Sequence, residues 1–192
     1  MLAVHARYRG KEARRALLVK RSAEALSTLE GVGEFQLLGV EDICAVVDSP
    51  AALCDTVMAL LSDGSWAVGI GVVPGTTDED LTRSTASGAL RGGARAGTVK
   101  VASLPKGTSS LAEDIAAVFA LVGHVLSKRT LEGREATSLV RSGLNQNEAA
   151  EELGISKQAM SQRLQAAGWQ AESAGWRLAV NLLARAEAGR YD

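Results

Sequence analysis

The residues best suited to recognition chemistry lie between positions 157 and 165, on one side of an expected helix. That side carries only hydrogen-bonding groups, those of Lys157, Gln158, Ser161, Gln162 and Gln165. In a DNA major groove about 12 Å wide, glutamine can form two hydrogen bonds with adenine and lysine can bond guanine. The pattern predicts a helix that reads bases in duplex DNA through Lys157, Gln158, Ser161 and Gln162.

Two short amphipathic helices joined by a tight turn must position these side chains. Asn145, with Glu148 three residues later, predicts a capping box at the start of the first helix. Gly154 supplies a left-handed turn, and Ser156 caps the second helix. The inner faces carry Ala149, Ala150 and Leu153 on the first helix, Ile155 at the corner, and Ala159, Met160 and Leu164 on the second.

Phosphate contacts are expected beside the base-reading face. The candidates are Ser156, Arg163, Arg141, Lys128 and Arg129. Residues 128 to 168 hold six basic and five acidic side chains, so this unit alone is nearly neutral. Phosphate affinity must therefore come from dimerisation or from another region.

The pattern Gln146, Ala150, Gly154, Ile155 and Met160 resembles the general helix-turn-helix signature. Residues 130–168 also resemble LuxR-type regulators and sigma-factor region 4, in which a helix with an Arg-Glu pair, here Arg134 and Glu135, precedes the reading unit. The resemblance implies an all-α DNA-binding domain over 128–192. A helical hairpin that merely packs, or one that makes protein contacts, is the alternative.

The composition is that of an ordinary soluble globular protein. The 192 residues are 46% hydrophobic and 22% charged with a net charge of -1, which suits one large or two small domains. Any attraction to nucleic acid must be local. Two basic clusters are candidates, although each could be a solvated face: Arg7, Arg9, Lys11, Arg14, Arg15, Lys20 and Arg21, and Arg83, Arg91, Arg95 and Lys100.

Catalytic, metal and membrane functions find little support. Cys44 and Cys54 have no second pair or nearby His and are expected to be reduced, packed thiols. His5 and His124 are expected to be isolated, with no Ser, Cys or Asp neighbours that suggest a triad. No signal peptide and no apolar run of about 18 residues is evident. We expect a cytoplasmic protein that is not an enzyme, with no cofactor, metal or membrane partner.

The N-terminal 104 residues predict an α+β domain. Strands are expected at 2–8, 35–40, 43–47 and 66–73, helices at 11–29 and 50–61, and a further strand at 98–104. The order strand, helix, strand, strand, helix, strand is that of a ferredoxin-like split βαβ domain, with its helices on one face of an antiparallel sheet. Gly69 and Gly71 lie inside an apolar strand, where close backbone packing explains them. Gly92 and Gly93, between Arg91 and Arg95, form either an anion cradle or a flexible connection.

A second resemblance covers most of the chain. The segments GVGEFQLLGVEDICAVVDSPAAL, SDGSWAVGIGVV and GISKQAMSQRLQAAGW are similar to SatD-like bacterial proteins, whose N-terminal part has features of nucleotide-cyclase domains. Cyclase-type sites hold metal ions with strand and hairpin carboxylates. Here His5, Ala6 and Arg7 occupy the first strand, and Glu41 and Asp42 suit a turn. A nucleotide-sensing or degenerate cyclase-like protein is therefore the alternative function.

A long helix at 109–127, capped by Ser110 and Glu113, joins the two parts. Its heptad seam is formed by Leu111, Ile115, Val118, Val122 and Val125. The seam could pack on the chain's own sheet or form a homodimer. Trp169 and Trp176 are expected to clamp the helix-turn-helix to a helical tail at 175–188 or to a partner subunit. A stacking platform for bases, which the lack of basic neighbours disfavours, and a β-hairpin wing at 169–178 are the alternatives.

These features together predict a bacterial transcriptional regulator that binds duplex DNA as a dimer. An adaptor that uses the helix-turn-helix for protein contacts is a further alternative. The operator, the direction of regulation and any small-molecule effector have no signature in the sequence.

Overall fold

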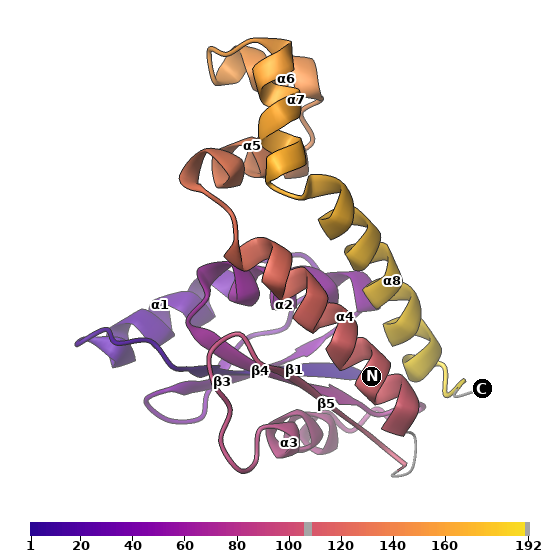
Figure 1. Ribbon diagram of the computed structural model, residues 1–192. Coiled ribbons are helices and arrows are strands. Elements are labelled where there is room, and N and C mark those ends of the chain that lie inside the picture. Colours follow the sequence, from indigo (N-terminus) through magenta and orange to yellow (C-terminus); the bar gives the residue numbers. More distant parts are fainter. Residues whose placement is uncertain (106–108, 191–192) are drawn as a thin grey trace.

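A five-stranded sheet with helices on both faces forms the body of this α+β protein, and three short helices stand away from it (Figure 1). The structure, a computed structural model, describes residues 1–105 and 109–190. The body contains β1 (Leu2–Tyr8), α1 (Arg15–Leu26), β2 (Gln36–Leu37), β3 (Asp42–Val47), α2 (Pro50–Asp63), β4 (Trp66–Val72), α3 (Glu79–Ala89) and β5 (Val99–Ser103). The C-terminal helices are α4 (Ser109–Ser127), α5 (Leu131–Arg141), α6 (Gln146–Glu152), α7 (Lys157–Ala166) and α8 (Trp169–Glu187).

The strand order is β2-β3-β1-β4-β5. β1 is antiparallel to both β3 and β4, and β5 pairs with β4 in parallel. Alternate residues of β1 point to opposite faces, so Leu2, Val4 and Ala6 enter the main core with α1, α2, α4 and α8. The expectation of helices on one face is wrong, because α3 covers the other.

Two glycines of β4 allow α3 to approach the sheet closely. A Cβ on Gly71 would lie 2.6 Å from the backbone nitrogen of Ala86, and one on Gly69 would lie 2.4 Å from the Ala86 carbonyl oxygen. This confirms that close packing, and not nucleotide binding, explains the Gly-Ile-Gly run. The sequence pattern did not predict the helix at Glu79–Ala89.

The apolar seam of α4 belongs to the chain's own core. Leu111, Ile115, Val118 and Val122 are buried in the cluster that includes α2 and α8, and Val125 is half-buried. The dimerisation role predicted for this seam is therefore wrong. Ser110 lies inside α4, which begins at Ser109, and does not cap it.

One stretch of α4 is long and apolar enough to cross a membrane. Residues 110–127 have a mean hydropathy of 1.5 over 18 residues, which corrects the expectation that no such run exists. In the structure one face of α4 packs in the main core, and 33% of that stretch is buried.

α8 belongs to both parts of the molecule. It is continuous from Trp169, so the wing considered for 169–178 does not form. Its second half contributes Ala179, Leu182 and Leu183 to the main core. Near its end, the Glu187 carboxylate lies 3.3 Å from the N-terminal amine. The helices α5, α6 and α7 thus lie after residue 128 and apart from the body, and α8 joins them to it.

Candidate nucleic-acid interface

The three helices α5, α6 and α7 share a small core of their own. Its buried members are Ala136, Ala149, Ala150, Met160 and Leu164, and Trp169 of α8 packs against them. Figure 1 shows α6 and α7 at the end of the molecule away from the sheet. The small residues at the α6–α7 crossing let the two helices pack closely.

Local capping fixes the starts of α6 and α7 as the sequence predicts. The Asn145 side chain accepts from the Glu148 backbone N–H at 3.1 Å, and the Glu148 carboxylate accepts from the Asn145 N–H at 2.8 Å. Gly154 takes a left-handed φ of 62° at the turn. Ser156 then caps α7 by accepting from the Ala159 N–H. The capping box, the turn and the second cap are confirmed.

The outward face of α7 is exposed. Lys157, Gln158, Ser161 and Gln162 are all exposed, as are Ser156 and Gln165. Arg163 is half-buried beside them. Because hydrogen-bonding side chains stand together on a helix at the free end of the molecule, this face can enter a groove of a duplex.

A buried carboxylate of α8 forms ion pairs with α5 and with the segment before it. Glu172 is 2% exposed, and its two oxygens accept from the guanidinium groups of Arg129 and Arg141. Arg129 also donates to the Ala167 carbonyl at 2.8 Å, and its side chain is 4% exposed. Arg129 therefore cannot contact a phosphate, and that prediction is wrong.

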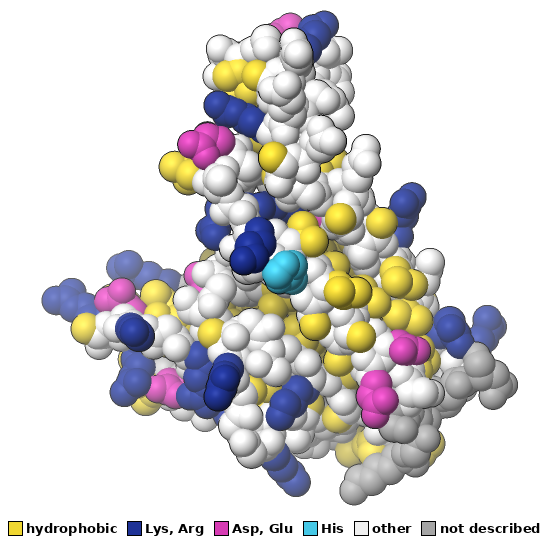
Figure 2. Space-filling view, in the orientation of Figure 1, with side chains coloured by type: hydrophobic (Ala, Val, Ile, Leu, Met, Phe, Trp, Pro, Cys, Tyr) yellow, Lys and Arg dark blue, Asp and Glu magenta, His cyan; other side chains and the backbone are white. Residues whose placement is uncertain are grey.

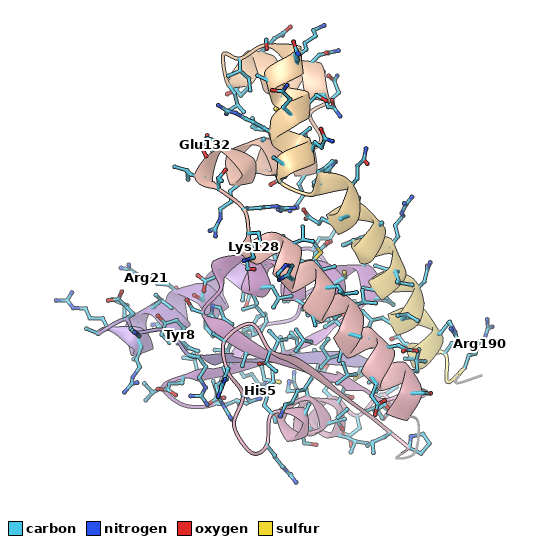
Figure 3. The ribbon with its side chains drawn as sticks, viewed as in Figure 1. His5, Tyr8, Arg21, Lys128, Glu132 and Arg190 are labelled. Atoms are coloured by element: carbon cyan, nitrogen blue, oxygen red, sulfur yellow. The ribbon has the colours of Figure 1, made fainter. Side chains whose placement is uncertain are left out.

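The other expected phosphate ligands are only partly available. Arg141 is held by Glu172 and lies over the Trp169 ring, 5.9 Å from its centroid, although half of its side chain stays exposed. Lys128 is exposed at the end of α4, and Figure 3 shows it near the junction with the body, away from α6 and α7. Ser156 and Arg163 lie beside the exposed polar face of α7.

The two basic clusters of the body are partly neutralised. Arg9 and Arg15 pair with Glu41 at 3.1 and 2.7 Å, and Arg83 pairs with Glu79. The two carboxylates considered for a cyclase-type site are thus engaged, since Asp42 in turn binds Arg7 at 2.6 Å. Among residues 1–105 and 109–190, no group of three or more His, Cys, Asp or Glu could hold a metal ion.

A polar network under α3 was not predicted from the sequence. His5 is 3% exposed, and its Nδ1 and Nε2 lie 2.7 Å from Ser87 Oγ and Asp42 Oδ1. The view that His5 lacks Ser or Asp neighbours is therefore wrong. Both ring nitrogens of the buried His5 thus have a partner, while Ser87 and Asp42 are half-buried.

Burial determines the protonation of that network. It lowers the pKa of His5 below its ordinary value of 6.5, although the Asp42 carboxylate opposes the shift. Burial raises the pKa of Asp42, but hydrogen bonds from His5 and Arg7 outweigh it and hold that pKa below its usual value. A neutral His5 that donates to ionised Asp42 satisfies both directions.

An open cleft lies between α2 of the body and the first half of α8, next to Arg141 of α5. Its volume is about 1010 Å³. It is lined by Leu29, Asp55, Met58, Ala59, Arg141, Trp169, Gln170, Glu172, Ser173, Trp176 and Arg177. Trp176 donates from Nε1 to Asp55 at 2.7 Å and so joins α8 to α2 of the body. The predicted clamp on the three short helices is formed by Trp169 alone.

One of the missed contacts had a signal in the sequence. Glu172 extends the buried stripe of Ala179, Leu183 and Ala186 by seven residues, which puts a carboxylate on an inner helix face. The partners of His5 had no such signal, because they lie 37 and 82 residues away. No family model, curated protein or solved structure matches the chain.

Proposed function

We propose that this chain is a sequence-specific DNA-binding protein, a cytoplasmic transcriptional regulator of bacterial type that acts as a dimer. Residues 131–168 form its helix-turn-helix unit, and β1 to β4 with α1 and α2 form a ferredoxin-like unit. The observation that carries the proposal is the exposed, wholly hydrogen-bonding face of α7 at the free end of the molecule. No residue is assigned a catalytic role.

The assigned contacts follow from position on α7. Lys157, Gln158, Ser161 and Gln162 read base edges, while Ser156 and Arg163 contact phosphates. The Glu172 network orients the three helices on α8, and so it positions the reading face without touching DNA.

Selection from a pool of random duplexes at two salt concentrations, followed by sequencing, tests the proposal. A palindromic motif is the expected result, with half-sites whose spacing reflects two reading units. Replacing Gln158 and Gln162 by Ala should cost about 1 to 3 kcal/mol for each lost base contact and erase preference at those positions. Gln36→Ala, an exposed change on β2, is the matched control. Retention without a motif would contradict specific reading, and no retention would favour an adaptor that contacts proteins.

The cleft favours a second candidate function, the sensing of a nucleotide. The faces of Trp169 and Trp176 can stack on a base, and Arg177 is an exposed cation for a phosphate. ATP should then quench tryptophan fluorescence and raise the melting temperature, whereas adenosine should do so weakly. Arg177→Gln should remove the difference between the two ligands. Equal responses to ATP and adenosine, or none, would rule this candidate out.

A further inference from the structure

The outer face of α4 carries a stripe that the chain's own core leaves uncovered. The stripe recurs at alternating spacings of three and four residues and consists of Asp114, Ala117, Leu121, His124 and Lys128, all exposed. Leu121 is 70% exposed. Among the large apolar side chains of the described residues, only Leu131, at 71%, is more exposed. We define these five residues as the α4 stripe.

Exposed apolar residues of α8 extend the α4 stripe sideways. Val122 of α4 packs on Gly175 of α8, which sets the two helices side by side. Leu178 is 49% exposed, and Ala174 and Ala171 are exposed one and two turns before it. Figure 2 shows the result as a continuous apolar patch over α4 and α8, with acidic side chains at its lower end. A patch of this kind on a soluble protein marks an interaction site.

Two opposite charges of the α4 stripe lie at equal distances on either side of Leu121. Asp114 precedes Leu121 by seven residues, and Lys128 follows it by seven. If a second copy packs antiparallel across Leu121, each Asp114 faces a Lys128 of the other copy, and both ends of the pair are neutralised. Parallel packing would instead set like charges together. The distance between the two charges is roughly 21 Å along the helix.

We propose that the α4 stripe, with Leu178 beside it, is the surface on which two copies of this chain form a two-fold dimer with antiparallel α4 helices. Leu121 lies near the two-fold axis. Ala117 and Ala174 are small, so the helix backbones of the two copies can approach closely. This inference specifies the dimer of the proposed function and replaces the buried seam as its surface, but it depends on no DNA contact.

Sedimentation equilibrium without DNA tests the surface. The wild-type chain should be a dimer, and Leu121→Glu should raise its dissociation constant by about 30-fold or more, as for a central interface residue. Because Leu121 is largely exposed, the variant should keep its melting temperature. The Gln158→Ala, Gln162→Ala variant should stay dimeric, so failure of DNA reading and failure of the dimer are separate results.

A charge exchange tests the antiparallel arrangement. Asp114→Lys and Lys128→Glu should each be monomeric, because each variant sets like charges face to face. An equimolar mixture of the two should dimerise, since every facing pair is then opposite in charge. Glu34→Lys, an exposed change away from α4, should dimerise as the wild type does.

Three results would overturn the proposal. They are a wild-type chain that stays monomeric, a dimer that survives Leu121→Glu, and single charge variants that remain dimeric or fail to pair when mixed. If a monomeric wild type instead floats with phosphatidylcholine vesicles and Leu121→Glu does not, the patch is a membrane contact and not a dimer surface.

Discussion

Single side chains in this protein act through partners far away in the chain. His5 is buried between Ser87 and Asp42, and its pKa lies below 6.5 because burial disfavours the imidazolium form. The unfolded chain therefore binds a proton more readily than the folded chain below that pH. Stability from His5 is complete above about pH 6.5 and is lost as the pH falls.

The free energy of unfolding should thus decrease from pH 7.5 to 5.5, by up to about 1.4 kcal/mol per pH unit from this one residue. Urea unfolding at several pH values measures the slope, and His5→Gln should flatten it. Asp42 adds a further loss only below its ordinary pKa of 3.8. Gln36→Ala, an exposed change away from α4, serves as the control and should leave the slope unchanged. An unchanged slope in His5→Gln would show that His5 is not the titrating group.

Glu172 is the residue on which the joint between the reading helices and α8 depends. Its carboxylate neutralises Arg129, whose side chain is 4% exposed. Removal of one member of a buried ion pair leaves a charge without compensation, at a cost of about 3 to 5 kcal/mol. We expect Glu172→Gln to lower the free energy of unfolding by this amount in urea titrations. Glu152→Gln, an exposed change on α6, should alter it by less than about 0.5 kcal/mol. Equal effects of the two variants would refute a structural role for Glu172.

At the scale of elements, glycine decides how closely α3 lies on the sheet. Gly71 of β4 faces backbone atoms of α3, so a methyl group there must push the helix away. Gly88, inside α3, faces open space. The same substitution should therefore have opposite effects at the two positions.

We expect Gly71→Ala to destabilise the protein by about 1 to 3 kcal/mol through overpacking. Gly88→Ala should stabilise it by up to about 1 kcal/mol, because alanine favours the helix. Differential scanning calorimetry compares the two melting temperatures. A stabilising Gly71→Ala would mean that α3 does not rest on β4 as the structure shows.

At the scale of the whole molecule, the charge distribution limits how DNA can be bound. Glu172 holds two of the six cations between 128 and 168, and Lys128 lies at the junction. Each unit of the proposed function then offers Arg134 and Arg163 to phosphates, because Lys157 is assigned to a base edge. The logarithm of the association constant should fall with the logarithm of salt concentration by about -2 for one unit and about -4 for a dimer.

Fluorescence anisotropy with the selected duplex at several salt concentrations measures this slope. The monomeric Leu121→Glu variant should give the shallower value and the wild type the steeper one. A slope near -10 in the wild type would show that basic side chains of the body, such as those of α1, also contact DNA.

Local patterns were sufficient for much of the fold and for the reading unit. The Asn145 and Glu148 capping box, the left-handed Gly154 and the inner face of α7 depend on residues within a few positions of one another. Loose alternation of apolar residues likewise located β1, and a short continuous apolar run located β4. Such short-range signals are readable because neighbours in sequence determine them.

Tertiary packing decided what those patterns could not. The α4 seam suits a dimer or a core equally well, and only contact with α2 and α8 assigns it to the core. Arg129 has the charge of a phosphate ligand, but Glu172, 43 residues away, buries it. The sequence by itself determined most of the helices and strands, although not α3, and the apolar face of the helices it located, because these are local properties. Which charged or apolar face stays free for a partner depended on long-range contacts.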